Sequence, residues 1–404
     1  MATEHLGDRI GKLRRLADLT QEGLAERSGV SVDVIRKLEQ HRKHSARLPT
    51  LHALAKGLGV ELTALLGDPP GVPSSGDADP PQLVAVRRAI MPPLFAPPVE
   101  PTGPEKVTLP LLRAELADAW TLYHAADFTR LTGLLPGVLA DARLLAAAGT
   151  ADQRAAGQAA LGKALQLAGH LAIRLGKTDL ALAALERAHS AAGQSSDPLL
   201  APMIANSVAW AYQRQARLDD ARRLAVHAAD GVAREQPGTA EGIRVWGGLL
   251  MSAATSYARG DDYATANDLM VEAERAAGRL STLPPPEDGR LVSVFSRSSV
   301  RIERVRLAVQ HERPEEALTL ARGIRISGDT PPSWRTWLLL DLARAHTDLG
   351  DAAGAVRTLE RLRRVAPGWM RHHTLAIAIV SDLWNGPARP PGLRRLAEHL
   401  GVTE

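Results

Sequence analysis

The stretch that decides the fold of the first part of the chain reads Thr20-Gln21-Glu22-Gly23-Leu24-Ala25, then Gly29-Val30-Ser31, then Ile35-Arg36-Lys37-Leu38-Glu39. Thr20 and Ser31 are each suited to cap the start of a helix, and Gly29 can take the positive φ that a tight turn between two helices requires. Ala25 is small enough for the two helices to cross there. Ile35 and Leu38 lie on one face of the second helix. The pattern predicts two short helices joined by a tight turn.

The flanking residues extend this pair to a compact helical domain. Apolar residues before it fall at helical spacing, and apolar residues after it predict a fourth helix that ends at Gly59. A short fifth helix is expected over residues 61–66. The apolar positions of the two outer helices are Leu6, Ile10, Leu13 and Leu16 before the pair, and Leu51, Leu54, Ala55 and Leu58 after it.

The helix pair at residues 20–39, together with Leu13-Arg14 and the closing Leu58-Gly59-Val60, resembles the lambda-repressor/Cro/Xre helix-turn-helix family. The resemblance covers about residues 6–66. The resemblance implies a five-helix DNA-binding domain at residues 1–67. It also implies that the second helix of the pair enters the major groove of duplex DNA. Members of this family usually bind as dimers to two half-sites about one helical turn apart.

The resemblance assigns roles to individual residues. Gln21 matches the family position that hydrogen-bonds a backbone phosphate. Arg36 and Lys37 are suited to guanine, and Val32 to a thymine methyl group. Asp33 either accepts a hydrogen bond from cytosine N4 or stabilises the helix start through its dipole, and the second role is favoured. The full set expected on the exposed face of the recognition helix is Ser31, Val32, Asp33, Arg36 and Lys37.

A basic loop follows the recognition helix, at a place where family members usually have a glycine. Its cations Arg42, Lys43 and Arg47 are expected to contact phosphates, although a solvated charge run is the alternative. Residues 1–67 hold 11 Lys and Arg against 8 Asp and Glu, whereas the remainder holds 38 against 37. Most of the net charge of +4 therefore belongs to the first domain, as expected for phosphate contact. No aromatic residue precedes Phe95, which favours duplex DNA over stacked single strands.

The rest of the chain divides into a linker and a helical array. Residues 68–104 are rich in Pro and Gly and predict a semi-rigid linker, with one isolated turn or two of helix near residues 82–90. Residues 105–404 show polar turns that are each followed by an alanine. These alanines are Ala181, Ala221, Ala266, Ala317 and Ala355, at spacings of 40, 45, 51 and 38. The pattern predicts an all-α chain that ends in an α-solenoid of tetratricopeptide-like helical hairpins.

The turns Gly176-Lys177-Thr178-Asp179 and Arg217-Leu218-Asp219-Asp220 deepen the resemblance, which extends to actinobacterial Xre-type regulators with tetratricopeptide-like C-terminal regions. The bias to Arg (42, against 7 Lys) agrees with a high-GC genome. By analogy, the array would dimerise or bind a peptide, a small molecule or a protein partner. For each candidate taken singly, the sequence favours a place in the core over a place in the groove of the array. The candidates are Asn206, Trp210, Gln213, Arg214, Arg244, Trp246, Trp334, Trp337 and Asp341.

Composition and motifs argue against other classes. Cysteine is absent, which excludes disulfides, thiol nucleophiles and Cys-based metal sites. The sequence suggests no signal peptide, membrane span, catalytic constellation, metal site or cofactor, so a cytoplasmic protein that is not an enzyme is expected. Residues 157–164 nearly spell a phosphate-binding loop but sit in an Ala-rich helical stretch. A nucleotide-dependent switch and an adaptor that does not bind DNA remain as alternatives to a regulator.

Overall fold

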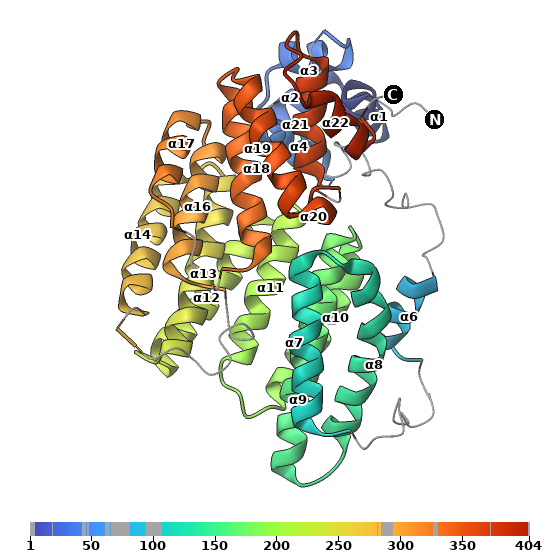
Figure 1. The fold of residues 1–404 in the computed structure, drawn as a ribbon, viewed down its shortest axis with the longest axis vertical. Helices are drawn as coiled ribbons and strands as arrows, with labels where there is room; N and C mark the ends of the chain where they lie inside the picture. The colour runs from blue at the N-terminus through green and yellow to red at the C-terminus, as the bar shows by residue number, and fades with distance from the viewer. Residues whose placement is uncertain are drawn as a thin grey trace.

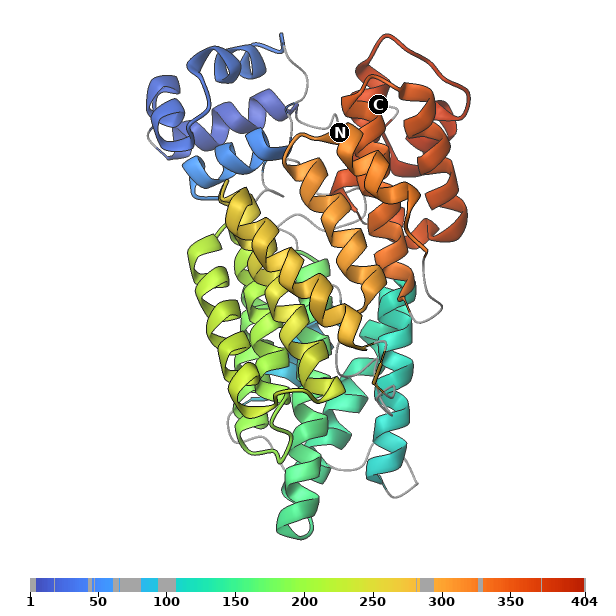
Figure 2. The same ribbon diagram turned by 90° about the vertical axis from the view of Figure 1, so that its left-hand side faces the viewer.

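The structure is a computed structural model that describes residues 5–17, 19–42, 46, 48–60, 65, 81–93, 107–280, 282–283, 294–325, 330–371 and 373–402. These residues form helices and loops and contain no strand, so the predicted all-α class is confirmed for the described part of the chain. A small N-terminal helical domain lies against one end of a large helical array (Figure 1, Figure 2).

The N-terminal domain contains α1 (Leu6–Leu16), α2 (Gln21–Ser28), α3 (Val32–Glu39) and α4 (Leu48–Leu58). Its core is formed by side chains that the apolar spacing predicts, among them Ile10, Leu24, Ile35 and Leu38, all fully buried. The expected fifth helix at residues 61–66 lies outside the described residues except for Leu65, which is buried in the same core.

Helix α6 (Pro81–Ile90) lies within the predicted linker. It is not an isolated turn, because Leu83, Val86 and Ile90 are buried in the core of the array, where α6 packs against α8. Arg143 on α8 donates to the carbonyl of Ala89 and so holds the end of α6. The sequence predicted a short stretch of helix here, but not that it docks on the array.

The array is a succession of helices in which each one packs mainly against the next. Its members are α7 (Leu109–Ala125), α8 (Phe128–Ala147), α9 (Ala151–Arg174), α10 (Thr178–Gly193), α11 (Leu200–Arg214), α12 (Leu218–Glu235), α13 (Ala240–Arg259), α14 (Tyr263–Leu280), α16 (Arg297–Gln310), α17 (Pro314–Arg322), α18 (Pro332–Asp348), α19 (Ala352–Val365), α20 (Pro367–Arg371), α21 (Thr374–Asn385) and α22 (Leu393–Leu400).

The tight turns between paired helices share one backbone feature. The residue two positions before the second helix has a positive φ in each turn. Besides Gly149 and Gly238, which precede α9 and α13 in this way, these residues are Ala126, Gly176, Ala216, Asp261, Glu312 and Gly350. Such a residue ends one helix and reverses the chain into the next. The five alanines singled out in the sequence each follow the last five of these residues by five positions, and every one is at most 2% exposed. Their predicted place at helix contacts is therefore confirmed.

The array curves until its later helices meet its first one. Helix α18 contacts α7, and the indole Nε1 of Trp369 on α20 donates to the carbonyl of His124 on α7 at 2.9 Å. The ring of His124 also hydrogen-bonds the hydroxyl of Ser333 at 3.0 Å. Side chains on α9, α11 and α18 are thereby brought together, although they lie far apart in the sequence.

Close helix contacts give a first prediction. A methyl group on Gly157 of α9 would collide with the backbone of Leu145 on α8. We therefore expect Gly157→Ala to lower the free energy of unfolding by about 1–3 kcal/mol. Gly133→Ala on α8 is the matched control, because nothing lies within 4 Å of its added methyl group. It should stabilise by up to about 1 kcal/mol. Thermal unfolding of the two variants should move in opposite directions, and equal shifts would contradict the predicted crossing.

Candidate DNA interface

Helices α2 and α3 are capped as the sequence predicts. The hydroxyl of Thr20 accepts a hydrogen bond from the Gly23 amide at 2.9 Å, and that of Ser31 accepts from the Val34 amide at 3.4 Å. Between the helices, Gly29 has φ +71° and its amide bonds back to the Ala25 carbonyl at 2.9 Å. The caps and the turn residue fix the angle between α2 and α3, and hence the direction in which α3 projects.

A buried carboxylate ties the first three helices together. Glu39, at the end of α3, accepts two hydrogen bonds from the Arg14 guanidinium, at 2.7 and 2.9 Å, and a third from the Gln21 amide at 2.7 Å. Both charged side chains are only 11–13% exposed. Burial would raise the pKa of Glu39, but the hydrogen bonds from Arg14 and Gln21 outweigh it and hold that pKa below its ordinary value. The Glu39 carboxylate therefore clamps α1, α2 and α3 in one arrangement.

The face of α3 opposite this clamp is open. Ser31, Asp33, Arg36 and Lys37 are exposed and Val32 is half-buried, and α3 lies at one end of the molecule (Figure 1). Lys37 forms an ion pair with Asp33 at 2.7 Å, while Arg36 lies 3.8 Å from Glu22. Both pairs are half-exposed, so they are weak and can exchange for other partners.

Of the other residues predicted to contact DNA, Gln21 is half-buried with its amide directed at Glu39 rather than at solvent. Arg42 is exposed at the end of α3, where its amide bonds to the Lys37 carbonyl. Lys43 and Arg47 lie outside the described residues. His41 has φ +59° and so takes a left-handed backbone conformation just past the end of α3.

His41 also belongs to the one group of described residues with the spacing of a metal site, together with His5 and Asp8. The His41 ring hydrogen-bonds Asp8 at 2.9 Å and stacks on His5 with ring centroids 4.2 Å apart, while Nδ1 of His5 accepts from the Gly7 amide. These contacts already explain why the three side chains lie close together. The group joins the start of α1 to the end of α3.

Residues 5–66 match the family model of a helix-turn-helix domain. The chain therefore carries a helix-turn-helix domain at its N-terminal end, in which α2 and α3 are the paired helices. No curated protein matches the chain. Among solved structures, the crystal structure of BtubC (BKLC) from P. vanneervenii is 19% identical over 63% of this chain and 90% of that chain, with a TM-score of 0.36. Among the described helices, none combines the length and the apolar composition that crossing a membrane requires.

In the array, some of the candidate groove residues meet around two half-buried arginines, Arg174 and Arg306. The guanidinium of Arg174 lies 5.0 Å from the ring centre of Trp210, 4.9 Å from that of Trp337 and 4.3 Å from that of Trp369. All three rings therefore lie within cation–π distance of the same guanidinium, that of Arg174. Burial lowers the pKa of the neighbouring His170 to about 3, and the charge of Arg174 lowers it further. The interior of the curved array is thus aromatic and cationic rather than a uniform apolar core.

A second arginine organises another part of the interior. Arg306 lies over Trp337 at 4.1 Å and over Trp334 at 6.0 Å. It also pairs with Glu303 at 2.9 Å and with Asp341 at 3.4 Å. Burial raises the pKa of Asp341 to about 7, against the lowering effect of Arg306.

The remaining candidates make other contacts. Gln213 is buried and its amide donates to Ser252 and Ser256 on α13. Arg244 donates to the Phe295 carbonyl at 3.1 Å, and Trp246 lies 5.7 Å from the Arg279 guanidinium. Asn206 and Arg214 are half-buried on α11.

Sequence reasoning missed Arg14, Glu39, Arg174 and Arg306 as organising residues. Arg14 and Glu39 are charged residues next to the apolar face of a predicted helix. That placement was the signal in the sequence that could have revealed them.

The clamp gives a second prediction. Glu39→Gln should open α1–α3, because the charge-assisted hydrogen bonds are lost and the mostly buried Arg14 keeps its charge without a counterion. A loss of about 1–3 kcal/mol is expected, which corresponds to roughly 5- to 150-fold faster amide exchange in these helices. Hydrogen–deuterium exchange mass spectrometry measures this change, with Glu26→Gln on the exposed face of α2 as the control.

The clamp should also depend on pH. Because the pKa of Glu39 is lowered on folding, the stability that its carboxylate contributes is present at neutral pH and is lost as acid protonates it. Unchanged exchange in Glu39→Gln would show that the clamp is dispensable.

Proposed function

We propose that the chain is a transcriptional regulator of the Xre type that binds duplex DNA in a sequence-specific manner. The observation that carries this proposal is the solvent-exposed face of α3, which the Glu39 clamp holds in place. A pre-set recognition helix with exposed polar and cationic side chains is suited to the major groove. Arg36 and Lys37 are the residues proposed to read bases, and Arg42, Lys43 and Arg47 are proposed to contact phosphates.

The array is proposed to be a solenoid of tetratricopeptide-like hairpins that dimerises, senses a peptide, a small molecule or a protein partner, or does both. The repeated left-handed turn residue and the buried alanine five positions after it support repeating units of one kind. In the same proposal the protein is an actinobacterial, cytoplasmic regulator without catalytic activity or cofactor.

An adaptor that does not bind DNA is the second candidate. The observation that favours it is the pairing of Arg36 and Lys37 with the acidic side chains of Glu22 and Asp33, which reduces the positive charge that α3 offers. The nucleotide-dependent switch has less support, because residues 157–164 lie inside α9. There Gly157 and Gly162 allow close helix contacts instead of a phosphate-binding loop.

Selection of sites from random duplex DNA by the full chain tests the proposal. We expect enrichment of a motif with two inverted half-sites about 10 base pairs apart, as a two-fold symmetric dimer would bind. Light scattering should then give the mass of a dimer of the 43.2-kDa chain. An absence of enriched sequence would favour the adaptor, and a monomer bound to a single half-site would refute dimeric recognition.

A further inference from the structure

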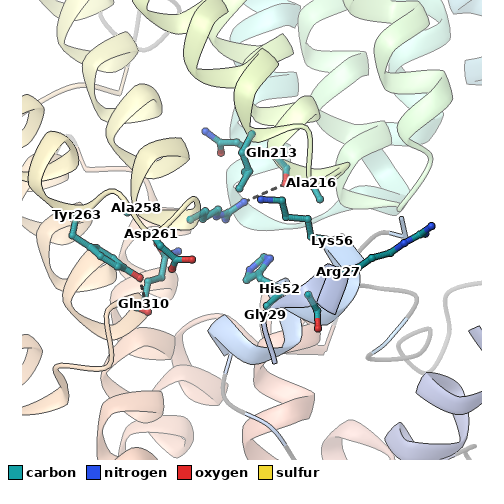
Figure 3. Close-up of a pocket in the computed structure, with 14 residues that line it drawn as sticks. Arg27, Gly29, His52, Lys56, Gln213, Ala216, Ala258, Asp261, Tyr263 and Gln310 are labelled. Atoms are coloured by element: carbon teal, nitrogen blue, oxygen red, sulfur yellow. Dashed lines mark hydrogen bonds between the residues drawn. The ribbon is translucent and has the colours of Figure 1, made fainter. Parts of the chain in front are cut away.

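A cavity of about 200 Å³ lies between the helix-turn-helix domain and the array. Helix α4 and the end of α2 form one wall, and the turns and helix ends of the array around α11, α13 and α16 form the other (Figure 3). The cavity therefore joins the part of the chain proposed to read DNA to the part proposed to sense.

The helix-turn-helix side of the cavity contributes a neutral ring and a cation. His52 and Lys56 lie one turn apart on α4 and point into the space between the walls, whereas Arg27 points away from it (Figure 3). Burial lowers the pKa of His52 to about 3, helped by the charges of Arg259 and Arg214. His52 is therefore uncharged at neutral pH, and Lys56 is the charge that this wall offers.

The array side contributes polar atoms that lack partners. The Nε of Arg259 and the amide oxygen of Gln310 are both buried and have no hydrogen-bond partner among the described residues. Gln310 as a whole is 8% exposed. Arg259 reaches the Gln213 carbonyl at 3.4 Å through another nitrogen, but it makes no ion pair with a carboxylate of the described chain. Leaving such groups unsatisfied is costly, which points to a ligand that supplies their partners.

The groups that line the cavity differ in the partners that they can take. Arg259 and the exposed Lys56 can bind an anion or another acceptor, whereas the Gln310 oxygen lacks a donor. Asp261, exposed at the turn before α14, adds a negative charge to the lining. A simple anion would satisfy the cations but would be repelled by Asp261 and would leave Gln310 without a donor.

We propose that this interdomain cavity binds a small zwitterion of the free amino-acid class. Its carboxylate pairs with Arg259 and Lys56, which belong to different walls, and its ammonium group faces Asp261 and the Gln310 oxygen. The size fits, because a cavity of roughly 150 Å³ holds benzene and pockets for drug-sized molecules start at about 300 Å³. A bound amino acid would bridge α4 and the array and so fix how the helix-turn-helix domain is held. Its effect on DNA affinity rests on the proposed function.

Isothermal titration calorimetry of the full chain without DNA tests the site, with each of the twenty L-amino acids as a probe. At least one is expected to bind with a Kd below about 1 mM, in the range of a weak but specific ligand. Its N-acetyl derivative and its carboxamide should each bind at least about tenfold more weakly, since each removes one charge. Arg259→Gln and Lys56→Gln should have a similar effect. Lys56 is exposed, so its substitution keeps the test valid where Arg259→Gln fails to fold.

Arg130→Gln, on an arginine of α8 whose side chain is 75% exposed, is the control and should leave binding unchanged. The proposal is overturned if no amino acid binds, if binding survives both cavity substitutions, or if inorganic phosphate binds and the amino acids do not. A mobility shift with and without the amino acid that binds is measured separately. A chain that fails to bind DNA would refute the proposed function and leave the calorimetric result standing.

Discussion

Replacing Arg36 and Lys37 together by alanine is expected to weaken binding to the selected operator by at least about 30-fold. Both side chains are half-exposed on the open face of α3, so the substitutions should leave the domain folded. A cation that contacts a base edge contributes about 1–3 kcal/mol. Loss of two such contacts weakens binding by roughly 30-fold to more than 10⁴-fold. Mobility shift or fluorescence anisotropy at several salt concentrations measures the effect.

The matched control is Arg222→Ala/Arg223→Ala on α12. It removes two adjacent arginines that also pair with acidic side chains on their own helix, at 2.8 and 3.0 Å, and it changes the net charge equally. It should retain operator affinity. Binding by the wild-type chain should also fall steeply with salt, because each phosphate contact releases counterions. If both double variants bound equally well, α3 would not be the reading helix and the adaptor would become the better assignment.

The features that sequence reasoning predicted correctly are local ones. Thr20, Gly29 and Ser31 act within one helical turn of their own position, so their residue type indicates their backbone role. The repeat alanines are similar, because a small side chain in a fixed register after a turn indicates a close helix contact. In the helix-turn-helix domain, the residues on the open face of α3 were those that the family resemblance implied, and four of those five are exposed.

The features that it missed depend on contacts between distant segments. The clamp joins Glu39 to Arg14, 25 residues away, and no local pattern specifies that pair. Gly7 and Gly57 permit close approaches to Leu38 and Ser28, yet in the sequence they look like ordinary helix glycines. The meeting of Trp369 with His124 spans 245 residues and follows from the curvature of the whole array. The sequence therefore identified several groove candidates without indicating that they surround half-buried arginines.

The second large effect is expected at one of those arginines, Arg306. Its guanidinium is the counterion of Glu303 and Asp341, which are 3% and 6% exposed. Arg306→Met keeps most of the packing on Trp337 but leaves two buried carboxylates without their cation, although Thr255 still donates to Glu303 at 2.7 Å. Breaking a buried ion pair from one side costs about 3–5 kcal/mol. Thermal and urea unfolding of the full chain should show this loss.

The pH dependence of that loss separates electrostatics from packing. The pKa of Asp341 is already raised to about 7 on folding, and removing Arg306 raises it further. A carboxyl with a raised pKa binds more protons in the folded chain than in the unfolded chain, so stability falls as pH rises through this range. The loss of stability in Arg306→Met should therefore be larger at pH 8 than at pH 6.

Arg304→Met on the same helix, whose partner Glu274 is 45% exposed, is the control and should cost less than about 1 kcal/mol. Adding Glu303→Gln and Asp341→Asn to Arg306→Met should restore much of the stability and flatten the pH dependence. A pH-independent deficit that these substitutions fail to relieve would assign the effect to lost packing on Trp337 instead of to stranded charge.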